Sequence, residues 1–108
     1  MTARTTRIKI PQNDYGWDLI FTCRDFTGAV VNITGFTIHF KVWEFNKPGV
    51  LLVNGVGAAV DAVNGIAKYT LAVGDFPTVG EFQGELEATK LGEVSSYQSF
   101  IVEVTESG

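Results

Sequence analysis

A regular alternation of side-chain type in one segment constrains how this chain folds. At every second position from 36 to 42 the side chain is apolar, and the alternating positions from 37 to 43 carry polar, charged or, at Trp43, aromatic side chains. Successive side chains point to opposite faces of a β-strand, so this pattern predicts a strand with one buried face. Similar runs recur along the chain between turns rich in Gly, Asn, Asp and Pro, and no segment has a helical period. The pattern predicts an all-β sandwich.

The turn signals divide the chain into seven or eight strands of one domain, 1–108, with flexible ends expected at 1–4 and 106–108. Strands are expected at 5–10, 17–24, 29–33, 36–45, 66–73, 81–90 and 94–105. Residues 50–60 are ambiguous, because their glycines weaken any strand. The inward positions of these strands predict the core: Leu19, Phe21, Phe36, Ile38, Phe40, Tyr69, Leu71, Phe82, Leu86, Phe100 and Val102.

Length and composition fit a globular domain that needs neither metal nor disulfide. The chain has 108 residues, of which 45% are apolar and 19% charged, which suits a folded domain rather than a disordered one. No apolar run approaches the roughly 20 residues of a membrane helix, and residues 1–10 lack the apolar stretch of a secretory signal. A basic stripe with interleaved aromatics, typical of nucleic-acid binders, is also missing. We therefore expect no membrane or nucleic-acid partner.

The titratable residues predict no catalysis and no bound metal or cofactor. His39 lies in mid-strand without a nucleophile and carboxylate to form a catalytic group, and Cys23 alternates with apolar residues, as a small buried side chain does. One His and one Cys exclude an ordinary zinc site. The acids Glu81, Glu85 and Glu87 share a strand face but lack the loop spacing of a calcium site, so a solvated face is expected. No small-molecule substrate is expected either.

Residues 75–82, a turn with Pro and Gly that leads into a strand beginning near Phe82, resemble the tyrosine corner of immunoglobulin-like sandwiches. Phe82 has no hydroxyl, so packing alone is expected to anchor this crossover.

Uneven charge suggests a hypothesis for assembly. Residues 1–47 carry six basic and four acidic side chains (+2), and residues 48–108 carry two basic and eight acidic ones (−6), which sum to −4. If basic residues lie at one exposed edge and acids on a distant face, copies could meet head to tail, with the outward Trp43 at the centre of the contact. The alternatives are a monomer with solvated charges and a Trp43 that caps the sandwich edge against a loop. The candidate interface residues are Arg4, Arg7, Lys9, Trp43, Glu81, Glu85 and Glu87.

Several stretches together resemble the N-terminal domain of phage baseplate upper proteins. In the first half these are 14–21 (DYGWDLIF), 24–28 (RDFTG) and 33–42 (ITGFTIHFKV). In the second half they are 64–71 (NGIAKYTL), 75–82 (DFPTVGEF) and 100–104 (FIVEV). The resemblance covers residues 8–105 and follows the order and spacing of that domain.

The resemblance implies an immunoglobulin-like antiparallel sandwich that serves as a structural or attachment module in the tail or baseplate of a tailed phage or prophage. It implies other virion or tail proteins as partners, a homo-oligomer among the options, and synthesis in the cytoplasm of the host bacterium. The family offers no catalytic or cofactor residue. A bacterial cell-surface or adhesin-type immunoglobulin-like module is the alternative, since such sandwiches also occur in secreted chains.

Overall fold

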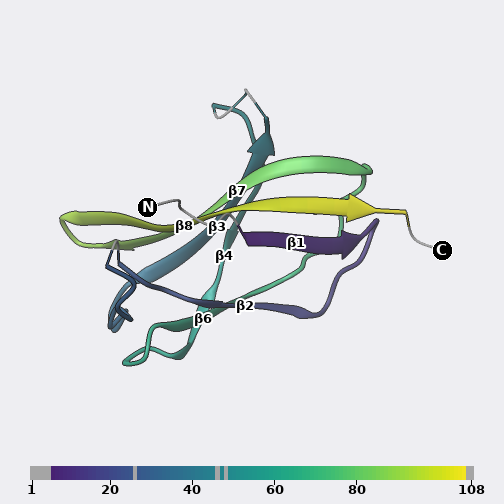
Figure 1. Cartoon of the computed structure of the whole chain (residues 1–108). Helices are drawn as coiled ribbons and strands as arrows, with labels where there is room; N and C mark the ends of the chain where they lie inside the picture. Colours follow the sequence, from purple (N-terminus) through teal and green to yellow (C-terminus); the bar gives the residue numbers. More distant parts are fainter. Residues whose placement is uncertain (1–5, 26, 46, 48, 107–108) are drawn as a thin grey trace.

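Two β-sheets of unequal size face each other in this chain (Figure 1). The computed structural model describes residues 6–25, 27–45, 47 and 49–106. The ends 1–4 and 107–108, for which flexibility is expected, lie outside the described residues, and with them the candidate interface residue Arg4. Residues 46 and 48 also lie outside them. The strands are β1 (Thr6–Pro11), β2 (Asp18–Thr22), β3 (Thr37–Glu44), β4 (Leu51–Val56), β5 (Ala58–Asp61), β6 (Ile66–Thr70), β7 (Gly80–Lys90) and β8 (Glu93–Thr105).

The strand order is that of an immunoglobulin-type sandwich. One sheet runs β1-β8-β7-β3-β4 and the other β2-β6-β5, which matches the division into a sheet built on strands C, F and G and one built on B, E and D. Figure 1 shows β2 and β6 in a layer below β1, β7 and β8. The predicted all-β sandwich is confirmed, with one difference. β1 pairs with β8 in parallel, which is possible because no short turn joins these two strands.

The core lies between the sheets and is centred on aromatic rings. The Phe40 ring lies 4.4 Å from that of Tyr69 and 5.4 Å from that of Phe100, and both pairs are stacked. Nine of the eleven predicted core residues are buried. The other two, Phe36 and Phe82, are partly buried and pack against the core; both lie near the start of a strand, at an end of the sandwich.

Two glycines are required because aromatic rings cover them. Gly84 of β7 lies directly opposite Phe100 of β8, and a Cβ at this position would fall 2.2 Å from the Phe100 ring. A Cβ at Gly55 of β4 would fall 2.2 Å from the Tyr69 ring. The missing side chains allow these rings to lie against the backbone of the sheet, which is how a strand interior tolerates glycine.

Two sequence expectations need correction. Residues 29–33 form no strand, and their pairing is reduced to one isolated bridge between Arg24 and Val30. In the strand expected at 17–24, the alternation that buries Leu19 and Phe21 also predicts an inward Trp17, but Trp17 is 38% exposed. It precedes β2, and its indole N–H donates to Asp14 at 2.9 Å. Alternation does not extend into a turn, so it misplaced this side chain.

Candidate interaction surfaces

The outer face of the five-stranded sheet presents a row of side chains that crosses every strand. In register, Arg7 of β1 pairs with Ile101, Ile101 with Gln83, Gln83 with Trp43, and Trp43 with Leu51 of β4. The Trp43 indole N–H donates to Oε1 of Gln83 at 3.2 Å. Trp43 is half-buried on β3, which lies between β7 and β4. The alternative in which Trp43 caps the edge of the sandwich is therefore wrong.

The head-to-tail hypothesis expects Arg7 to lie far from the acidic face of β7, and this expectation is wrong. Arg7 donates to Glu81 and, at 3.3 Å, to Glu103. These contacts, chiefly the hydrogen bond and charge of Glu81, raise the pKa of the Arg7 guanidinium. The cause is topological: β1 joins the sheet beside β8, which places Arg7 on the same face as the acids of β7 and β8. The head-to-tail hypothesis thereby loses its premise of distant faces.

The remaining predicted interface residues share this outer face. Lys9 is exposed on β1, opposite Glu103 in register, while Glu85 is half-buried on β7. Glu87 is half-buried and accepts a hydrogen bond from the Lys41 ammonium at 2.9 Å. The acidic side chains of β7 are therefore partly paired, rather than all solvated as expected.

His39 and Cys23 lie where the sequence placed them. His39 is half-buried on the outer face, where its Nε2 lies 3.4 Å from the Thr89 hydroxyl. Cys23 is fully buried, and burial raises the pKa of its thiol. Within the described ranges, no three His, Cys, Asp or Glu side chains gather in a way that could hold a metal ion. The same ranges contain no helix that is long and apolar enough to cross a membrane.

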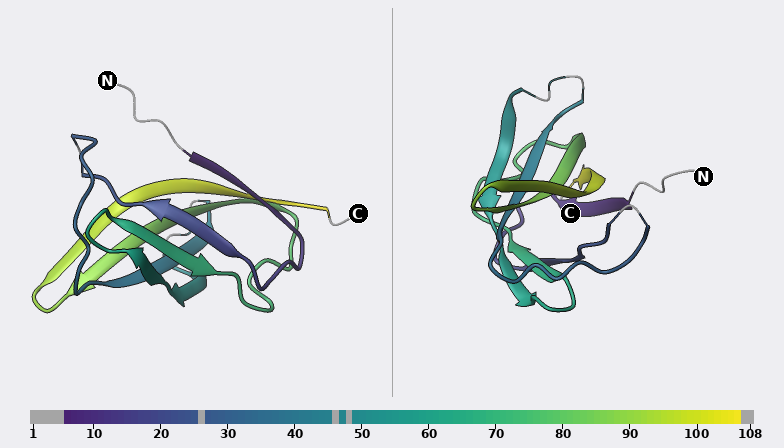
Figure 2. Two further views of the ribbon diagram at one scale, coloured as in Figure 1. Left: turned by 90° about the horizontal axis from the view of Figure 1, so that it is seen from below. Right: turned by 90° about the vertical axis from the view of Figure 1, so that its left-hand side faces the viewer.

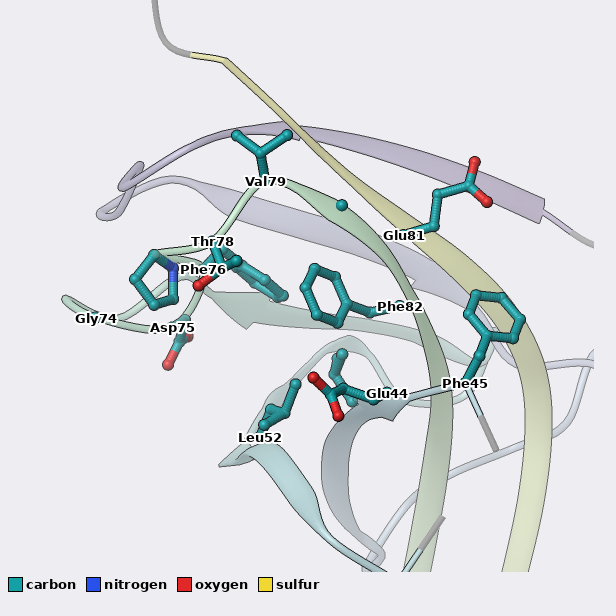
Figure 3. A pocket seen from close by; sticks show the side chains of 13 residues that line it. Glu44, Phe45, Leu52, Gly74, Asp75, Phe76, Thr78, Val79, Glu81 and Phe82 are labelled. Atoms are coloured by element: carbon teal, nitrogen blue, oxygen red, sulfur yellow. The ribbon is translucent and has the colours of Figure 1, made fainter. Parts of the chain in front are cut away.

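A pocket of about 490 Å³ opens at one end of the sandwich (Figure 3). Its walls come from the end of β3, the start of β4, the β6–β7 connection and the start of β7. The rings of Phe76 and Phe82 lie on one side, and Leu52 and Glu44 lie across from them. Sequence reasoning missed this pocket. Its one sequence signal is the aromatic turn at 75–82, which by itself indicates only a packing anchor.

A tyrosine does anchor the crossover beside this pocket, but it is not at the predicted position. Tyr69 of β6 donates its hydroxyl to Oδ2 of Asp75, and the same carboxylate oxygen accepts the Ala72 amide at 2.9 Å. Burial, and then the Asp75 hydrogen bond and charge, raise the pKa of the Tyr69 hydroxyl. The contact fixes the β6–β7 connection, and Phe82 is left to line the pocket.

The fold has a clear counterpart among solved structures. The chain superposes on a structure described as the N-terminal domain of phage TP901-1 ORF48 with a TM-score of 0.73 and 17% sequence identity, covering 97% of this chain and 92% of that one. At this identity the likeness shows a shared fold. No family model matches the sequence, and no curated protein matches it.

Proposed function

We propose that this chain is a non-enzymatic structural and attachment protein of a tailed-phage or prophage particle, placed in its tail or baseplate. The observation that carries the proposal is the fold shared with the phage TP901-1 ORF48 domain over 97% of the chain. The sequence stretches that resemble the N-terminal domain of baseplate upper proteins, at 14–21, 24–28, 33–42, 64–71, 75–82 and 100–104, also support it. Synthesis in the cytoplasm of the host bacterium follows from the same proposal.

Other virion or tail proteins are the proposed partners, and the outer face around Trp43 is the proposed contact. Trp43 lies near the end of β3, one strand in from the β4 edge, and is flanked by Gln83 and Leu51. Trp is among the side chains most often found as interface anchors. Nucleic acid, membranes and small-molecule substrates have no part in this proposal.

Particle composition tests the assignment. Particles purified on a density gradient from the strain that encodes the chain are analysed by quantitative mass spectrometry. We expect the chain to sediment with the tail proteins at a constant ratio to them across the particle peak. A chain found only in the soluble fraction, with particles that lack it, contradicts a virion role.

Two tryptophans allow a matched test of the contact. Trp43→Ala and Trp17→Ala each remove a partly exposed indole, but Trp17 lies in a turn away from the outer face. Supplied to a strain whose own copy is deleted, Trp43→Ala is expected to enter particles poorly and Trp17→Ala normally. If Trp43→Ala folds and enters particles as well as the unchanged chain, the outer face is not the contact, and the virion assignment is judged on the composition experiment alone.

A further inference from the structure

Strand β4 is one of the two edge strands of the five-stranded sheet, and the direction of its backbone groups follows from its pairing with β3. The Gly57 amide, one residue past β4, donates to the Ile38 carbonyl at 2.8 Å. Hydrogen-bonded and non-hydrogen-bonded pairs alternate in an antiparallel ladder. Gly55 and Val53 therefore also bond toward β3, and the amides and carbonyls of Asn54 and Val56 point away from it, to the open side. Figure 2 shows this margin of the sheet in its right-hand view.

The side chains along this edge are uncharged and, apart from Asn54, apolar. Residues 49–60 contain no Asp, Glu, Lys or Arg. Leu52 is 49% exposed and Val56 66% exposed. The register with β3 shifts once, between Val42 and Trp43, and is regular from Val53 to Val56. An uncharged, mostly apolar edge with outward-directed amides favours pairing with another strand.

The other three edge strands carry features that discourage such pairing. β1 presents the charged Arg7 and Lys9 and ends at a proline. β2 begins at Asp18, which pairs with Lys68 of β6 at 3.6 Å. β5 has four residues, includes Asp61 and is interrupted by a register shift. Charge, short length and irregularity are the usual means of protecting an edge, and β4 has the least of them.

We propose that β4 is a self-pairing edge, at which a second copy of this chain adds its own β4 antiparallel to the first. A two-fold axis brings like surfaces together, so any charge near it meets a like charge. Such pairing at β1 would bring basic side chains together, and at β2 or β5 acidic ones. β4 meets itself without this repulsion, and the two five-stranded sheets become one continuous sheet. The proposal does not depend on the virion assignment.

Self-pairing would also extend the outer face. Leu51 of β4 stands beside Trp43 in register, so the two tryptophans of a dimer would lie on one surface, each one strand away from the joined β4 strands. A single chain has one row of outer-face side chains from Arg7 to Leu51, and the dimer would have two such rows that run in opposite directions.

Sedimentation equilibrium of the full chain from about 10 μM to about 1 mM tests the proposal. We expect a monomer–dimer equilibrium. Val56→Lys puts two ammonium groups at the joined edge and is expected to raise the dimer dissociation constant about tenfold or more. Ile20→Lys is the matched control, because Ile20 is 58% exposed on another edge strand, β2. It is expected to leave the constant within about threefold.

A second variant acts on the backbone. Asn54→Pro removes an amide that points away from β3, and proline is tolerated at such an edge position. It should weaken the dimer about tenfold or more, since the amide and its symmetry mate both lose a partner.

Hydrogen exchange of the unchanged chain tests the same site without any substitution. The amides of Asn54 and Val56 should exchange more slowly as protein concentration rises through the dimer transition. The Gly55 amide, which bonds to β3, should be protected at every concentration. A monomer throughout the range overturns the proposal. So does a dimer in which the Asn54 and Val56 amides do not slow, or one that neither variant weakens.

Discussion

Truncation of Phe40 is the most direct test of how this core is held together. The side chain is fully buried. Its ring stacks on Tyr69 with an interplanar angle of 10° and on Phe100 with one of 14°. Phe→Ala changes in cores cost about 3–5 kcal/mol. Aromatic contacts contribute about 0.5–1.5 kcal/mol beyond the area they bury. We therefore expect Phe40→Ala to lower the free energy of unfolding by about 4–5 kcal/mol.

Urea denaturation followed by circular dichroism measures this loss. A domain of this size is stable by roughly 5–15 kcal/mol, so the variant is expected to fold marginally and to have a much lower midpoint. Phe45→Ala is the matched control, since Phe45 directly follows β3 and is 42% exposed. It should cost about 1 kcal/mol or less. If Phe40→Ala costs less than about 2 kcal/mol, or no more than Phe45→Ala, the sandwich is not centred on this ring.

Three further predictions follow from single contacts. Tyr69→Phe removes the hydroxyl bond to Asp75 and should lower stability by about 1–3 kcal/mol in thermal denaturation; an unchanged midpoint would show that the bond is not formed. Gly84→Ala should cost about 1–3 kcal/mol in the same assay, because its Cβ would meet the Phe100 ring, and a stabilised variant would contradict that contact. Hydrogen bonds, first that from the Thr27 hydroxyl, lower the pKa of Asp25. Its contribution to stability is present above about pH 4 and is lost as pH falls further, so Asp25→Asn should flatten acid denaturation, and an identical acid profile would argue against it.

Local periodicity explains why most of the fold could be predicted. A strand buried on one face has an apolar side chain at every second residue. Ile38, Phe40 and Val42 follow this pattern, and all three are buried. The pattern fails where a residue leaves the strand: Trp17 continues the alternation in sequence but lies in a turn. The pattern also fails where the chain passes from one sheet to the other. Only Gly57 separates β4 from β5, so in the sequence the two strands form one ambiguous apolar stretch.

Contacts between distant segments could not be predicted in the same way. The Arg7–Glu81 ion pair joins residues 74 positions apart, and it depends on the parallel register of β1 with β8. Nothing in the composition of β1 specifies that register. The pocket depends likewise on three separate segments that meet at one end of the sandwich. The sequence showed which side chains are apolar, but it did not show which of them surround an opening.

The ion pairs on the outer face change how self-association can be explained. A charge paired within the chain, as Arg7 is with Glu81 and Lys41 with Glu87, attracts a second copy less than a free charge does. Head-to-tail assembly driven by charge should weaken as salt is raised from about 0.05 M to 1 M, because screening shortens to about 3 Å. Pairing of the uncharged β4 edges involves backbone hydrogen bonds and apolar side chains, so it should persist at high salt. A dimer that dissociates at 1 M salt would therefore favour the charged surfaces, and one that persists would favour β4.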